Sequence, residues 1–93
     1  MTKVIMMISK NGTVMFDCLN HSDDHDVCTI VSTLCNVLVE ACFRSGHEPT
    51  VYNSGHVRID ITEAPYPTLE TFRIVDKLFR AVAEQNPDFV KIY

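Results

Sequence analysis

The chain has 93 residues, of which 46% are hydrophobic and 22% charged, and its net charge is −4. A chain of this length should form one domain over residues 1–93, with a core but little surplus stability. The acidic balance and the lack of a basic run argue against a direct nucleic-acid surface. We also expect no apolar run long enough to span a membrane.

The N-terminal part of the sequence predicts a β-hairpin. Residues 3–9 are apolar on both faces, which is typical of a strand inside a sheet. Asn11-Gly12 favours a tight turn, because both residues tolerate positive φ angles. Residues 13–19 then return as a second strand with Cys18 on its apolar face. The hairpin should bring His21 to a strand end, where functional loops usually lie.

A helical period begins near Val27 and should end at Gly46. The predicted core stripe consists of Val27, Ile30, Val31, Leu34, Leu38 and Ala41. An adjacent stripe, at steps of four and three residues, consists of Cys28, Ser32, Cys35, Val39 and Cys42. We expect the last three members of this second stripe to have an exposed side that would suit a dimer surface.

The second half of the chain predicts another hairpin, a second helix and a last strand. Residues 49–52 and 56–62 read as strands across a turn. The prolines at 65 and 67 should delay the helix until Thr68, a suitable N-cap, and residues 89–92 should form a short strand. The order ββαββαβ predicts an α+β two-layer sandwich, with two amphipathic helices against a mostly antiparallel sheet of four to five strands.

The chemically suggestive residues collect where the first hairpin leads into the first helix. Asp24 or Asp26 could cap this helix, and Cys28 would lie in its first turn. The positive field of a helix N-terminus stabilises a thiolate there. With His21 close by in the chain, this segment has the minimum parts of a cysteine nucleophile and its base. Ser32 follows one turn later on the same face.

The same segment resembles the ribosomal-processing cysteine protease (Prp) family. That family has a Gly-His-Ala step, a short variable loop and a Cys-Ala-x-x-Ser helix start. Here the corresponding residues are Asn20-His21-Ser22 and, after five residues, Cys28-Thr29-Ile30-Val31-Ser32. Asn20 replaces the glycine, and asparagine is the next most tolerant residue for a left-handed backbone, so a glycine-like turn is expected.

The resemblance implies a cysteine endopeptidase with Cys28 as nucleophile, His21 as general base and Ser32 as a supporting residue. An acidic residue of the loop should orient His21 through its second ring nitrogen, and we name Asp26 as that supporting residue. Asp23 and Asp24 are alternatives to Asp26 for orienting His21, and Asp17 is a weaker one. The implied substrate is the N-terminal extension of a large-subunit ribosomal protein, or a capsid or scaffold protein in bacteriophages. The resemblance also implies a homodimer, and it calls for no cofactor.

Two other hypotheses fit the sequence: a non-catalytic, ribosome-associated interaction module of the same fold, and a zinc-stabilised binding domain. The zinc ligands would be Cys18, His21, His25 and Cys28. Paired Cys-x-x-Cys knuckles are absent, which argues against zinc. The helical cysteines are spaced too widely for disulfides with one another, so we expect four thiols and a cytoplasmic protein. His47 and His56 are expected to be solvated.

Overall fold

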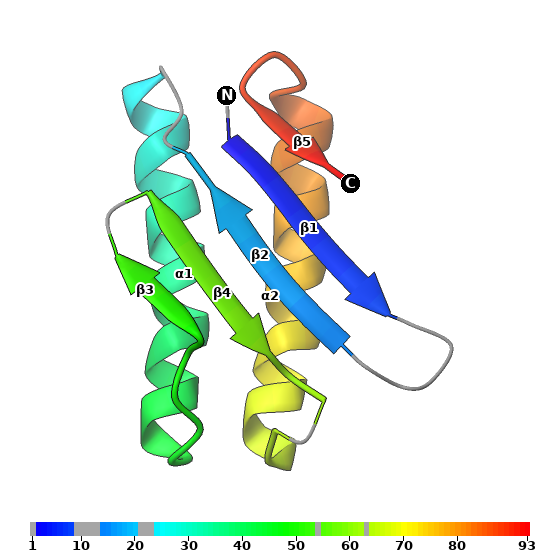
Figure 1. The fold of residues 1–93 in the computed structure, drawn as a ribbon. Helices are drawn as coiled ribbons and strands as arrows, with labels where there is room; N and C mark the ends of the chain where they lie inside the picture. Colours follow the sequence, from blue (N-terminus) through cyan, green and yellow to red (C-terminus); the bar gives the residue numbers. More distant parts are fainter. Residues whose placement is uncertain (1, 9–13, 21–23, 54, 63) are drawn as a thin grey trace.

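In a computed structural model, which describes residues 2–8, 14–20, 24–53, 55–62 and 64–93, two helices lie side by side on one face of a single sheet (Figure 1). The elements in chain order are β1 (Thr2–Ile8), β2 (Val14–Leu19), α1 (His25–Arg44), β3 (Val51–Asn53), β4 (His56–Asp60), α2 (Tyr66–Gln85) and β5 (Val90–Ile92). The predicted two-layer α+β fold with the order ββαββαβ is confirmed.

The five strands are arranged in the order β3-β4-β2-β1-β5. Three of the neighbouring pairs are antiparallel, and only β1 and β5 run parallel. The two hairpins explain the pairs β1–β2 and β3–β4, whereas β2 and β4 pair across the intervening α1 and β3. β5 reaches the far edge of the sheet by way of α2. The turn predicted at Asn11-Gly12 lies outside the described residues, but the antiparallel pairing of β1 with β2 agrees with it.

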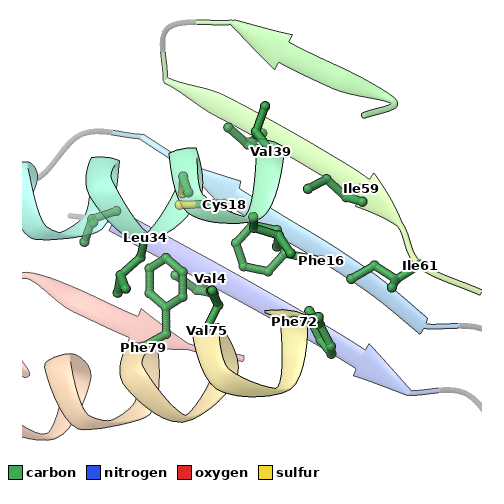
Figure 2. Packing of buried hydrophobic residues seen from close by; sticks show 14 of the residues in the cluster. Val4, Phe16, Cys18, Leu34, Val39, Ile59, Ile61, Phe72, Val75 and Phe79 are labelled. Carbon is green, nitrogen blue, oxygen red and sulfur yellow. The ribbon is translucent and has the colours of Figure 1, made fainter. Parts of the chain in front are cut away.

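The core fills the space between the sheet and the two helices (Figure 2). Phe16 is fully buried at its centre, and its ring lies 5.6 Å from that of Phe79 and 6.4 Å from that of Phe72, measured between centroids. Side chains alternate along a strand, so Phe16 and Cys18 of β2 face the helices while Asp17 faces the other way. Each large side chain buried in this way stabilises the fold by about 1.5–3 kcal/mol.

The second stripe of α1 is not the exposed surface that we expected. Cys35, Val39 and Cys42 are only 6%, 3% and 0% exposed, whereas Ile30 of the predicted core stripe is 44% exposed. The sheet therefore covers α1 from the side of the second stripe, and Ile30 is turned outward. These three residues belong to the core, so the dimer surface predicted from them is wrong.

By length and composition alone, α1 could cross a membrane, although we expected no such run in the sequence. The core helix of a soluble protein passes the same test. In this fold the apolar face of α1 is occupied by contacts within the chain. Its buried residues are Val27, Val31, Leu34, Cys35, Leu38, Val39 and Cys42.

The start of α2 also differs from the prediction. The helix begins at Tyr66 rather than Thr68, and Pro65 precedes it without a side-chain cap. Pro67 fits because an N–H in the first turn has no partner within the helix. Thr68 is fully buried, donates to the carbonyl oxygen of Ala41 at 3.2 Å and lies 2.7 Å from the hydroxyl of Ser45. The residue predicted to cap α2 therefore joins α2 to the end of α1.

Candidate active site

The end of β2 has the left-handed backbone that the sequence predicted. Asn20 has φ 71°, the only positive value at a non-glycine residue in the described part of the chain. Its N–H donates to the carbonyl oxygen of Gly55 at 2.8 Å, and its own carbonyl accepts from the Thr2 hydroxyl at 3.3 Å. The residue before His21 is therefore held by both β1 and the β3–β4 turn.

The start of α1 settles which acidic residue caps the helix. Asp24 has an extended backbone, and its carboxylate accepts from the N–H of Val27 at 3.0 Å. The N–H of Cys28 donates to the Asp24 carbonyl oxygen at 2.9 Å. Cys28 thus lies half-buried in the first turn of a capped helix, at its positive end. Asp26 is exposed in the same turn.

Three residues of the sequence separate Asn20 from Asp24. His21, Ser22 and Asp23 lie outside the described residues, so the contact between His21 and Cys28 stays a prediction. The end of β2 and the start of α1 lie at the same end of the molecule (Figure 1).

A cavity of about 400 Å³ opens beside the middle of α1 and the end of β2. It is lined by Cys18, Asn20, Ser32, Cys35, Asn36, Tyr52, Asn53, Gly55, His56 and Val57. Ser32 is exposed and lies one turn after Cys28, so the predicted supporting residue contributes to the cavity wall. The Tyr52 hydroxyl donates to the Asn36 side-chain oxygen at 3.4 Å across one side of the cavity. Cys28 itself is not among the residues that line the cavity.

Sequence reasoning missed a charge cluster on the other face of the sheet. Asp17 is only 4% exposed, and its carboxylate accepts from Arg58 at 2.9 Å and lies 2.6 Å from Nε2 of His56. His56 is therefore paired rather than solvated, as is His47, whose ring lies against the Asp60 carbonyl oxygen. Because both Asp17 oxygens are engaged on this face, Asp17 is a poor candidate for orienting His21.

The structure places the residues proposed as zinc ligands in different surroundings. Cys18 is buried under α1 and shares a hydrogen bond with Cys35, and His25 is exposed at the helix start. Within the described residues, no three His, Cys, Asp or Glu side chains gather as metal ligands would. His21, the fourth proposed ligand, lies outside them. The buried position of Cys18 argues against a shared site with Cys28.

No protein-family model and no curated protein matches the sequence. Solved structures do match. The essential ribosomal processing protease Prp from S. aureus, in complex with a covalently linked product peptide, has a TM-score of 0.78 at 19% identity, covering 99% of this chain and 97% of that one. The same protease with a substrate peptide has a TM-score of 0.77 at 20% identity, covering 100% and 98%.

A third structure, SMU.848 from Streptococcus mutans, has a TM-score of 0.74 at 21% identity and covers 99% of this chain and 91% of its own. These likenesses extend over nearly the whole of each chain. The resemblance read from the segment between Asn20 and Ser32 is therefore confirmed at the level of the fold. The chain has the fold of the ribosomal processing protease Prp.

Proposed function

We propose that this protein is a cysteine endopeptidase that removes the N-terminal extension of a large-subunit ribosomal protein. The observation that carries the proposal is the pairing of two local structures: the left-handed Asn20 just before His21, and the capped helix start that carries Cys28. Asn20 directly precedes His21 in the sequence, and Cys28 lies in the first turn of the helix that follows. The Prp fold and the peptides bound in the Prp structures support the same reading.

In the proposed mechanism, His21 accepts the proton of the Cys28 thiol, and the sulfur attacks the carbonyl carbon of the scissile peptide bond. The tetrahedral intermediate collapses when the C–N bond breaks, and His21 returns the proton to the departing amine. Water then hydrolyses the thioester, with His21 again acting as base. Asp26, exposed in the first turn, would orient His21.

The helix start also limits which groups can stabilise the oxyanion. The N–H groups of Val27 and Cys28 already donate to Asp24. The candidate donors in the first turn are therefore the N–H groups of His25 and Asp26, which a helix leaves without intrahelical partners. Ser32, on the cavity wall, would hydrogen-bond the part of the substrate that lies beyond the thioester.

The test is incubation with a bacterial large-subunit ribosomal protein that retains its N-terminal extension, followed by mass analysis of the products. Wild-type protein should release one N-terminal peptide, and Cys28→Ala should release none. Cys42→Ala is the matched control, because it removes a fully buried thiol from the same helix and should leave cleavage intact. Binding of the substrate without any cleavage would instead support the non-catalytic interaction module.

A homodimer, which rests on the resemblance, and a cytoplasmic location, which rests on the expectation of free thiols, complete the proposal. Sedimentation equilibrium would test the dimer: a mass of 10.6 kDa at all concentrations would exclude it. Fractionation of cells that produce the protein would test the location. Neither result bears on the roles proposed for Cys28 and His21.

A further inference from the structure

Two buried thiols from different elements meet beneath α1. Cys18 comes from β2 and Cys35 from the middle of α1, and they are 5% and 6% exposed. The Cys18 side chain points from the sheet toward α1 (Figure 2). Both side chains line the same cavity, and the two thiols share a hydrogen bond. The two sulfurs are therefore neighbours, although 17 positions separate them in the sequence (35 − 18).

The hydrogen bond makes the two thiols unequal. It lowers the pKa of Cys18 because the donated proton stabilises a thiolate there, and this effect exceeds the opposing effects of burial and of the Asp17 charge. The same bond, together with burial, raises the pKa of Cys35. Cys18 is thus suited to react first as the nucleophile, with Cys35 protonated beside it.

Small molecules can reach the pair despite its burial. Both cysteines line the cavity of about 400 Å³ beside α1. By contrast, Cys42 is fully buried, does not line this cavity, and has its pKa raised by burial. Cys18 and Cys35 are therefore both accessible to a small molecule, and each has a second thiol beside it.

We propose that Cys18 and Cys35 form an oxidation site, at which a hydroperoxide converts the two thiols into a disulfide between β2 and α1. The Cys18 thiolate attacks one peroxide oxygen: an S–O bond forms, the O–O bond breaks, and the leaving oxygen takes up a proton as water. The Cys35 sulfur then attacks the sulfenic sulfur of Cys18. The S–S bond forms, the S–O bond breaks, and a second water leaves with the Cys35 proton. Two thiols are oxidised and one hydrogen peroxide is reduced.

The bond would tie β2, which precedes His21 in the sequence, to α1, which carries Cys28. Cys18 lies three residues before His21, and Cys35 lies two turns after Cys28. Under the proposed function, oxidation would therefore hold β2 against α1 and change the rate of peptide cleavage. This consequence depends on the proposed peptidase activity, whereas formation of the disulfide does not.

The experiment treats the folded, reduced protein with hydrogen peroxide, blocks the remaining thiols by alkylation, and digests it with a protease that cuts before aspartate. The cut before Asp17 and the next before Asp23 separate Cys18 from the cysteines of α1. The expected product is a cross-link between the Cys18 peptide and the α1 peptide that dithiothreitol reverses. Because α1 retains three cysteines after digestion, the partner is assigned with variants.

The cross-link should disappear in Cys35→Ser and persist in Cys28→Ser and Cys42→Ser. Folding of each variant is checked by circular dichroism, and Cys35→Ala replaces Cys35→Ser if the serine variant unfolds. The wild-type protein provides a test without mutation: the cross-link should form several-fold faster in the folded chain than in guanidinium. Equal rates in the two states, no cross-link in folded protein, or a cross-link that survives Cys35→Ser would each overturn the proposal. These readouts stand whether or not the protein cleaves peptides.

Discussion

The two halves of α1 use the same stripe of residues in different ways. In the first half, Cys28 is half-buried and Ser32 is exposed, so both side chains are available to a ligand. In the second half, Cys35, Val39 and Cys42 lie under the sheet and form part of the core. Residues at one regular helical spacing are therefore accessible to a ligand at the first end of α1 and packed in the core at the other end.

The difference follows from where the sheet lies along the helix. In the second half of α1, the Thr68 hydroxyl of α2 joins the two helices at Ala41. The first turn, by contrast, is held by its own cap at Asp24. Substitution of Cys28 or Ser32 should therefore affect activity more than stability, and substitution of a buried residue in the second half should do the opposite.

The largest expected effect is that of Cys28→Ala. Loss of the nucleophile should reduce cleavage more than about a thousandfold, because the catalytic groups act as a unit. The free energy of unfolding should change by only about 1 kcal/mol, since a half-buried site leaves a small cavity. Cleavage of the extended ribosomal protein and urea denaturation measure the two quantities. Wild-type cleavage by this variant would end the protease proposal.

Leu38→Ala, in the second half of α1, should have the opposite effect and lower stability rather than cleavage. Leu38 is fully buried, so the truncation should lower the free energy of unfolding by about 2–5 kcal/mol. At a temperature where the variant remains folded, its rate of cleavage should match that of the wild type. The control is Val37→Ala, one residue away and 48% exposed, which should cost no more than about 0.5 kcal/mol. Similar losses from both variants would contradict the placement of α1 against the sheet.

Asp24→Ala should have a smaller effect, and it should lower both the stability of the protein and its rate of cleavage. The side-chain cap contributes about 1 kcal/mol, and its loss should let the first turn fray around Cys28. Cleavage should therefore fall by more than the loss of folded protein explains. Asp26→Asn is the comparison for stability, because Asp26 is exposed in the same turn. It should leave the helix start intact, so a loss of stability equal to that of Asp24→Ala would count against the cap.

The smallest effect is a pH dependence at the far end of the molecule. The hydroxyl and N–H of Thr62 donate to the Asp60 carboxylate and lower its pKa below the usual value of 3.8. The stabilisation is present above the unfolded pKa and is lost as the pH falls through the lower folded pKa. The difference in stability between wild type and Asp60→Asn should therefore be greater at pH 7 than at pH 2.5. Urea midpoints at the two pH values measure it, and cleavage at pH 7 should not change.

Much of the candidate site could be predicted because it depends on neighbours in the chain. The cap at Asp24 satisfies an N–H three residues away, and the left-handed backbone of Asn20 is a preference of the residue itself. Period and turn residues likewise predicted the seven elements found in the described residues, with ends displaced by a few residues. Such preferences can be read from a short window of sequence.

Interactions between distant residues could not be read in this way. Asp17 is 39 and 41 residues from His56 and Arg58, and Cys18 contacts Cys35 only because β2 lies under α1. The sequence alone indicated which residues share a strand face or a helix stripe. Only the tertiary structure decided which of them the sheet covers and which thiols meet, because a period is a property of one element and burial depends on the elements packed against it.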